Sequence, residues 1–418
     1  MNEHKKLARY YYRQGDFSSA NREYLLAHKQ QDGDPQILLA LGLLALWNNQ
    51  TKPAINYFET VYRKSAWLAR RWPFCAQIAY RMAQAYSRVD DFTRAAYWYD
   101  RAAGPWALGP FKAIRSMQIQ ALHLADKMAY QVSGADCSVS KFILLDPLPL
   151  VEVYLDGKGP FSFFIDTGAA DVIVQSDLAK ELGLSKFAEF TGSFAANKKA
   201  PVGVSVLGEL RLDQLSIKHV PVHLHTLAGV DDIFQRKIHG VIGTSLLRHF
   251  YATIDYAGQQ LRLALINNGS TRALAESSWS AVSIPFWLID SHMMMARGRI
   301  NELPYTLFFI DTGLANSGFL VSRDSQQAAG IKPDWSSAKT SSGGGGQLRY
   351  VDFELNKVVL GEGNNSFSKS NVKAQQHQSD QMVLQGKLGF NVAGLISHDF
   401  FKGTALTLDF EAMRLIIQ

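Results

Sequence analysis

Cysteine, long apolar runs and an apolar leader are scarce or missing in this sequence. The 418 residues include only two cysteines, Cys75 and Cys137, and neither belongs to a CxxC pair or to a Cys/His cluster. The sequence therefore predicts no metal site, no cofactor and no disulfide framework. No apolar run is long enough to span a bilayer, and the opening residues, MNEHKKLARYYYRQGDF, lack the apolar core of a signal peptide. We expect a cytoplasmic protein without a transmembrane segment; a leader preceding this N-terminus would instead indicate an exported or periplasmic protein.

The positive charge of the chain is confined to its first third. Residues 1–140 contain 18 Lys and Arg against 11 Asp and Glu, a net charge of +7, whereas the other residues contain 25 against 26. The basic residues are spread out rather than gathered in a run, so the pattern does not indicate nucleic-acid binding. A solvated helical surface is the simpler interpretation, and a surface for an acidic partner is the alternative.

The first third has the periodicity of helices. Apolar and aromatic residues recur at helical spacing in residues 37–47, 54–62, 75–86 and 94–102. Three polar turns each lead to a small residue: GDFSSA ends at Ala20, NQTKPA at Ala54 and DDFTRA at Ala95. These alanines are 34 and 41 residues apart, and the first interval is the tetratricopeptide period. This part resembles tetratricopeptide repeats, with a generic helical bundle as the alternative. The resemblance implies a domain that recruits a protein partner or substrate, with aromatic residues that pack between helices.

The periodicity changes after the GPWALGP segment at residues 104–110, although a last helix is expected to run to about Tyr130. Residues 150–155 alternate as a strand, Asp156 and Gly157 form a hairpin turn, and residues 161–165 return. A polar stretch at residues 267–280 is typical of a linker. The predicted organisation is a helical domain over residues 1–135, a β-rich lobe over 140–268 and a second β-rich lobe over 278–418.

The two β-rich halves repeat one another. The hexapeptide FFIDTG at residues 163–168 recurs without change at residues 308–313, which places Asp166 and Asp311 at equivalent positions. A polar turn lies ten residues before each aspartate. Each half also closes alike: GVIG at residues 240–243 corresponds to GLIS at 394–397, and a Thr-hydrophobic-Asp strand ends at Asp255 in one half and Asp409 in the other.

This order of motifs resembles the retropepsin-like and pepsin-like aspartic peptidases over roughly residues 145–418. The resemblance implies two all-β acid-protease-type lobes after the helical repeat, and a catalytic dyad of Asp166 and Asp311 supplied by one chain, with a monomeric active unit. It also implies that Thr167 and Thr312 bond across the lobe interface. Gly168 and Gly313 would permit the tight turns that present the carboxylates.

The chemistry explains these residue types. Hydrolysis of a peptide bond without a metal or a covalent intermediate needs a base for the attacking water and an acid for the carbonyl oxygen. Two carboxylates that lie close together share a proton, so that one can act as each. The predicted function is therefore an aspartic endopeptidase that acts on protein or peptide substrates.

Two residues in the second half depart from the family pattern. Leu314 follows the second Asp-Thr-Gly where a small residue is usual, and Ser397 replaces the expected glycine. These departures favour the alternative, a scaffold that binds peptides without cutting them. A glycosidase based on the two carboxylates is a third reading without support in the motif.

Glycine-rich hairpins that close over the substrate are a further feature of the family. A predicted flap lies about thirty residues after Asp311, at Gly343, Gly344, Gly345 and Gly346, with an ordinary loop as the alternative. Residues 191–194 occupy a similar place in the first half.

Three further groups of residues receive structural rather than catalytic interpretations. Asp255 and Asp409 are expected to stabilise turns, because each ends a strand. His398 and Asp399 are expected at a loop surface, because no serine in a strained elbow accompanies them. The methionines at 293–295 are expected in core packing rather than at a metal site.

Overall fold

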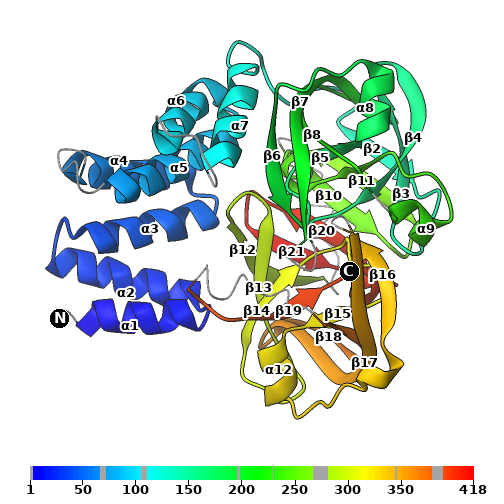
Figure 1. Ribbon diagram of the computed structural model, residues 1–418. Coiled ribbons are helices and arrows are strands. Elements are labelled where there is room, and N and C mark those ends of the chain that lie inside the picture. The colour runs from blue at the N-terminus through cyan, green and yellow to red at the C-terminus, as the bar shows by residue number, and fades with distance from the viewer. Residues whose placement is uncertain are drawn as a thin grey trace.

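The computed structural model describes residues 3–65, 72–104, 111–194, 198–227, 229–266, 281–343, 346–378 and 389–418. Within these ranges an array of helices forms the first third, and strands dominate the other two (Figure 1). The helices are α1 (Glu3–Arg13), α2 (Phe17–Gln30), α3 (Pro35–Trp47), α4 (Thr51–Ser65), α5 (Trp72–Arg88), α6 (Phe92–Ala103) and α7 (Phe111–Leu122). The expected extension of the last helix to Tyr130 is wrong, because α7 ends at Leu122.

The three similar polar turns join helices within successive hairpins. Each contains a residue with positive φ, namely Gly15, Asn49 and Asp90, which lets the chain reverse directly after a helix. The next helix then begins, and the amide groups of Ala20, Ala54 and Ala95 donate to carbonyl groups four residues earlier. All three alanines are completely buried between the paired helices. A larger side chain at these positions would hold the helices apart, which explains the small residue.

The first lobe is built on one sheet with the strand order β1-β8-β5-β9-β4-β3-β7-β6. Its strands are β1 (Gln131–Gly134), β3 (Leu150–Leu155), β4 (Lys158–Ile165), β5 (Val172–Gln175), β6 (Ala188–Ser193), β7 (Lys199–Leu212), β8 (Leu215–His225) and β9 (Gly240–Ile242). Three short helices accompany them: α8 (Ser176–Leu182), α9 (Val230–Phe234) and α10 (Thr244–Leu247). The hairpin predicted around Asp156 and Gly157 is confirmed as β3 and β4.

The second lobe repeats this pairing scheme. Its strands are β13 (Met293–Ile300), β14 (Thr306–Ile310), β15 (Phe319–Val321), β16 (Lys339–Gly343), β17 (Gly346–Glu362), β18 (Asn365–His377) and β19 (Val392–Ile396). Its short helices are α12 (Arg323–Ala328), the 3₁₀ helix η3 (Trp335–Ser337) and α14 (His398–Phe401). Strand β14 pairs in parallel with β19 as β4 does with β9, and β15 pairs with β18 as β5 does with β8. The duplication predicted from the sequence is thus present in the topology.

A further set of strands joins the two lobes in the order β12-β21-β20-β10-β11-β2. These strands are β2 (Cys137–Lys141), β10 (Phe250–Asp255), β11 (Gln260–Leu265), β12 (Val282–Ile289), β20 (Ala405–Asp409) and β21 (Arg414–Ile417). At the centre, Thr253 of β10 lies opposite Thr407 of β20, and their hydroxyl groups are 2.8 Å apart. The pseudo-twofold axis that relates the lobes therefore passes between two equivalent threonines.

The helical array shares a hydrophobic core with the second lobe. Phe17, at the start of α2, is 1% exposed, and its ring lies 5.4 Å from that of Trp287 and 5.1 Å from that of Phe390. Trp47 of α3 completes the aromatic group, and Met293 and Met295 belong to the same core. The expected packing role of the methionines is confirmed, with Met294 in the core of the lobes.

The helices also contact the first lobe. The side-chain amide of Gln120 in α7 donates to the carbonyl groups of Ser205 and Val222 at 2.8 and 3.2 Å, and the ring of His123 stacks on Phe187 at 3.6 Å. The array thus contacts both lobes, on the left-hand side of the view in Figure 1.

All three units meet at Arg88, the last residue of α5. Its buried guanidinium donates to the carbonyl groups of Leu46 in α3 and of Leu288 and Asp290 in the second lobe. Arg248 of the first lobe in turn donates to the carbonyl group of Arg88.

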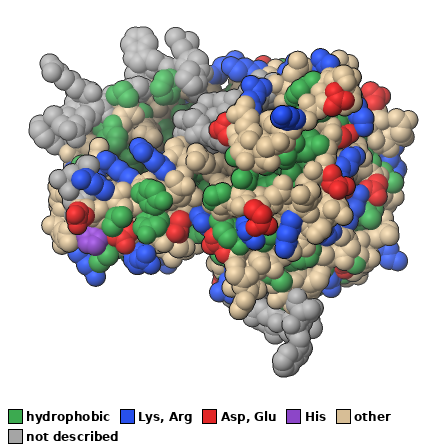
Figure 2. All heavy atoms as spheres, turned by 90° about the horizontal axis from the view of Figure 1, so that it is seen from below, with side chains coloured by type: hydrophobic (Ala, Val, Ile, Leu, Met, Phe, Trp, Pro, Cys, Tyr) green, Lys and Arg blue, Asp and Glu red, His purple; other side chains and the backbone are tan. Residues whose placement is uncertain are grey.

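The surface is consistent with the dispersed charge expected from the sequence. On the face in Figure 2, Lys and Arg side chains lie among Asp and Glu side chains rather than in a single patch. None of the helices in the described part of the chain combines the length and apolar character needed to cross a membrane. The predicted linker at residues 267–280 and residues 105–110 of the GPWALGP segment lie outside the described residues.

Candidate active site

Two equivalent loops carry Asp166 and Asp311 at the ends of β4 and β14. The amide group of Asp166 donates to the carbonyl group of Ile242 at 3.0 Å, and that of Asp311 donates to the carbonyl group of Ile396 at 3.0 Å. Strands β9 and β19 therefore hold the two loops from below in the same way, as expected for residues 241–243 in the first lobe.

Each carboxylate accepts a hydrogen bond from the glycine two residues later. The amide group of Gly168 lies 2.7 Å from Oδ1 of Asp166, and that of Gly313 lies 3.0 Å from Oδ1 of Asp311. These short turns fix the orientation of both carboxyl groups.

The two loops bring the carboxyl groups of Asp166 and Asp311 next to one another, each against the glycine of the opposite loop. The glycines explain how this is sterically possible. A Cβ atom on Gly168 would lie 2.5 Å from the carboxyl group of Asp311, and one on Gly313 would lie 2.3 Å from that of Asp166. Any other residue would push the two carboxyl groups apart. The two aspartates of one chain thus lie side by side, and their pairing as a catalytic dyad stays a prediction.

Thr167 and Thr312 interlock the two loops. The amide group of Thr167 donates to the hydroxyl of Thr312 at 3.0 Å, and the amide group of Thr312 donates to the hydroxyl of Thr167 at 3.1 Å. Each hydroxyl then donates across the interface, to the carbonyl group of Ile310 at 2.8 Å and of Ile165 at 3.2 Å. Both threonines are buried, and the cross-lobe bonds implied by the family resemblance are present.

Burial and mutual repulsion make the two carboxyl groups harder to ionise. Burial raises the pKa of Asp311 well above its usual value, and the charge of Asp166 raises it further. Burial also raises the pKa of Asp166, but the hydrogen bond from the Gly168 amide opposes that rise. The pair therefore retains a proton above the usual aspartate range. Both residues keep partial solvent access, so that water can reach the pair.

Two hairpins occupy equivalent positions in the two lobes. Strands β6 and β7 pair from Ala188↔Val204 to Ser193↔Lys199, and β16 and β17 pair from Lys339↔Tyr350 to Gly343↔Gly346. The predicted flap coincides with the second hairpin, and its tip residues Gly344 and Gly345 lie outside the described residues. The role of this hairpin as a flap stays a prediction.

Asp255 and Asp409 stabilise turns. Asp255 accepts hydrogen bonds from the amide group of Gly258 at 2.7 Å and from the side chain of Gln260 at 3.0 Å. Asp409 accepts from the amide groups of Glu411 and Ala412. The structural interpretation of both residues is confirmed.

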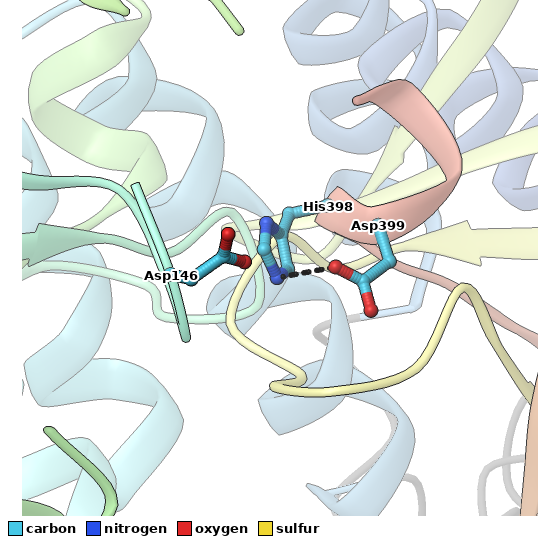
Figure 3. A group of neighbouring side chains, drawn as sticks. All are labelled: Asp146, His398 and Asp399. Atoms are coloured by element: carbon cyan, nitrogen blue, oxygen red, sulfur yellow. Dashed lines mark ion pairs between the residues drawn. The ribbon is translucent and has the colours of Figure 1, made fainter. Parts of the chain in front are cut away.

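The expectation that His398 lies at a loop surface is wrong. His398 begins α14 and is 0% exposed, because the turn after β19 points its ring into the space between the lobes. Its Nε2 atom lies 3.1 Å from Oδ1 of Asp399, and Asp146 of the first lobe approaches from the other side (Figure 3).

The donor atoms of these three residues are close enough together for a cation. The ammonium group of Lys402, however, forms ion pairs with both Asp146 and Asp399. Because Lys402 already supplies the positive charge, we interpret this group as a polar contact between the lobes. No local pattern indicates this group of residues, since Asp146 and Lys402 are 256 residues apart.

The comparison with protein families bears directly on the first lobe. Residues 151–246 match the aspartyl protease family. The match includes Asp166, its loop and the β9 support, so the resemblance predicted from the sequence is confirmed over these residues. None of the curated protein sequences matches this chain significantly.

Three solved structures are similar to parts of the chain. A retropepsin-like aspartic protease from Rickettsia conorii has 17% identity and a TM-score of 0.23, over 33% of this chain and 95% of that one. The N-terminal domain of stress-induced protein-1 (STI-1) from C. elegans has 16% identity and a TM-score of 0.25, over 28% and 91%. Basic 7S globulin from soybean has 9% identity and a TM-score of 0.39, over 69% and 95%.

Proposed function

We propose that this protein is an aspartic endopeptidase in which Asp166 and Asp311 form the catalytic dyad. The observation that carries the proposal is the close approach of two carboxyl groups on equivalent, interlocked loops. Because both aspartates belong to one chain, the active unit is a monomer.

The hydrogen bonds to the two carboxyl groups are the basis on which we assign the roles, because the amide group that donates to Asp166 lies at 2.7 Å and the one that donates to Asp311 at 3.0 Å. Asp166 acts as the carboxylate, the general base that takes a proton from the attacking water. Asp311 keeps its proton and donates it to the oxygen of the scissile carbonyl group. When the resulting gem-diol intermediate collapses, Asp311 takes back a proton from one of its hydroxyl groups, and the proton held by Asp166 passes to the leaving amine. The pair then returns to its starting state without a covalent intermediate.

The substrate class is a protein or an extended peptide. The hairpins β6–β7 and β16–β17 would cover such a peptide from the two lobes and exclude water from the reacting bond. The helical array would recruit a protein substrate or partner. The contacts of this array with both lobes would keep such a partner at a constant position relative to the dyad.

A non-catalytic peptide-binding scaffold is the second candidate, and Leu314 is the observation that favours it. This bulky residue directly follows Gly313, where the first lobe has Ala169. A larger side chain beside the dyad could restrict the approach of a peptide bond while binding persists.

Cleavage of an unbiased peptide library, read by mass spectrometry between mildly acidic and neutral pH, separates the two candidates. The enzyme requires that Asp166→Asn and Asp311→Asn each abolish cleavage, with no further loss in the double variant, because the pair acts as one unit. Asp32→Asn is the control, since the side chain of Asp32 is 91% exposed. Cleavage that survives in Asp311→Asn would exclude the dyad, and wild-type protein that binds peptides without cutting them would favour the scaffold.

A further inference from the structure

The turn beneath each aspartate loop differs between the lobes. In the first lobe β9 leads into Gly243 and Thr244, and in the second lobe β19 leads into Ser397 and His398. From the sequence alone, Ser397 is a departure that puts the second lobe in doubt.

In the first lobe, backbone and threonine groups hold the aspartate loop. The amide group of Thr244 donates to the carbonyl group of Ala169 at 3.0 Å, and its hydroxyl donates to that of Thr167 at 2.9 Å. Gly243 has no room for a side chain, because a Cβ atom would lie 2.3 Å from the carbonyl oxygen of Asp171.

In the second lobe, a side chain performs the equivalent task. Ser397 is completely buried, and its hydroxyl donates to the carbonyl group of Leu314. Leu314 directly follows the second Asp-Thr-Gly, as Ala169 follows the first. The carbonyl group that a backbone amide holds in the first lobe is thus held by a serine hydroxyl in the second.

Ile396 and Ser397 together contact the aspartate loop near both of its ends. The residue before it, Ile396, accepts the hydrogen bond from the Asp311 amide at 3.0 Å. The residue before Leu314 is Gly313, whose amide group donates to the Asp311 carboxylate. The amide group of Ser397 itself donates to the carbonyl group of Gly318 at 3.0 Å, which anchors the turn. Movement of the Leu314 carbonyl group would therefore also shift the neighbouring Gly313, whose amide group orients the Asp311 carboxylate.

We infer that Ser397 is a positioning residue that holds the loop of Asp311 in its catalytic geometry. This inference rests on the proposed function for its catalytic meaning, but the geometry that it assigns exists in the protein whether or not peptides are cut. The inference also links the two residues that depart from the family pattern. The hydroxyl of Ser397 holds the loop at the position of the larger residue, Leu314.

The test compares Ser397→Ala, Ser397→Gly and Ser397→Cys with Ser138→Ala. Ser138 is a matched control, because its buried hydroxyl also donates to a carbonyl group, that of Leu212 at 3.2 Å, away from the dyad. We expect kcat to fall about 10- to 100-fold in Ser397→Ala and Ser397→Gly with little change in KM, since small displacements of reacting groups cost that much. Ser397→Cys, a weaker donor of similar size, should lie between these variants and wild type. Ser138→Ala should match wild type in both constants.

Titration of ¹³C-labelled aspartate carboxyl groups by NMR gives a second readout that requires no cleavage. Loosening the loop weakens the coupling between Asp166 and Asp311, so the two titration steps of the pair should move closer together in Ser397→Ala and stay unchanged in Ser138→Ala. Ser397→Gly with wild-type kcat and wild-type carboxyl titrations would overturn the inference. If wild-type protein cuts nothing, the proposed function fails, and the titrations alone decide whether Ser397 positions Asp311.

Discussion

Nη2 of Arg248 lies 2.7 Å from Oδ1 of Asp90, which joins the turn between α5 and α6 to the first lobe. The other two similar turns are docked as well. Asn49 donates to the carbonyl group of Phe410 at 2.8 Å, and a Cβ atom on Gly15 would lie 2.5 Å from the side chain of Leu307. The repeated turns of the helical array are therefore part of the surface by which it binds the two lobes.

Asp90 is expected to stabilise this docking. Its burial would raise the pKa of its carboxyl group, but Arg248 and His249 outweigh burial and lower that pKa below its usual value. Asp90→Asn should reduce the free energy of unfolding at neutral pH by about 1 to 3 kcal/mol, because a charged partner of Arg248 is lost. The loss should shrink as the pH falls below the usual aspartate range, where the wild-type carboxylate is protonated too. Chemical denaturation at several pH values measures this free energy. The control is Asp126→Asn at an exposed position, and an equal loss of stability in that variant would contradict the prediction.

Phe17→Ala should uncouple the helical array from the second lobe. Both Phe17 and Phe58 are buried, and their truncation should cost about 3 to 5 kcal/mol each. Phe17 packs on Trp287 and Phe390 of the second lobe, whereas Phe58 packs among helices only. Hydrogen exchange of β12 and β13 should therefore accelerate under native conditions in Phe17→Ala much more than in Phe58→Ala. Equal protection of these strands in both variants would show that the shared core does not couple the domains.

Thr167→Val and Thr312→Val should loosen the dyad while the fold persists. Each change leaves a buried amide and a buried carbonyl group without the hydroxyl partner, at a cost of about 1 to 3 kcal/mol. Cleavage should decrease in both, and Thr167→Ser, which keeps the hydroxyl, should recover most of it. Thermal midpoints and cleavage rates that are unchanged in both valine variants would remove the interlock from the mechanism.

Asp311→Asn should stabilise the folded protein at neutral pH. The pKa of Asp311 is raised in the folded state, so ionisation favours the unfolded chain once the pH exceeds the usual aspartate value near 3.8. An asparagine removes this pH-dependent loss. The thermal midpoint of the variant should exceed that of wild type at pH 7, and the difference should vanish below about pH 4. A variant that is less stable than wild type at pH 7 would show that the carboxyl group is not strained.

His398 should make the protein sensitive to acid. Burial lowers the pKa of His398 to about 4, and the charge of Lys402 adds to this although Asp399 opposes it. The other charged or titratable groups nearby are Asp146, Lys369 and Tyr256. The folded state keeps the imidazole neutral while the unfolded chain takes up a proton below about pH 6.5. Stability is therefore lost as the pH falls from about 6.5 to 4, by up to about 3 kcal/mol.

His398→Gln should reduce this acid-dependent loss, measured as the free energy of unfolding across that pH range. The comparison with wild type isolates His398, because Asp311 is present in both proteins. Its contribution to the pH dependence, which has the opposite sign to that of His398, therefore cancels. The same change at exposed His123 is the control. A parallel pH dependence in wild type and His398→Gln would mean that His398 is protonated in the folded protein.

The duplicated lobes, the positions of Asp166 and Asp311 on equivalent loops and the interlocked threonines could be predicted from residues that are neighbours in the sequence. Each lobe has the same short apolar strand followed by the same Asp-Thr-Gly turn. The repeated helical turns could be predicted too, because a polar turn and a small alanine recur together. Each of these patterns lies within a single hairpin, so its residues are close together in the sequence.

The contacts between these elements became apparent only in the folded protein. Folding places the repeated turns on the lobes, buries His398 between the lobes with Asp146 and Lys402 beside it, and gives the Ser397 hydroxyl a partner in Leu314. These contacts join residues 83 to 361 positions apart. Their energy depends on burial and on the direction of a donor toward an acceptor, and neither has a period along the chain. Ser397 in place of the expected glycine therefore looks unfavourable from the sequence alone, whereas in the folded protein it supplies a hydrogen bond.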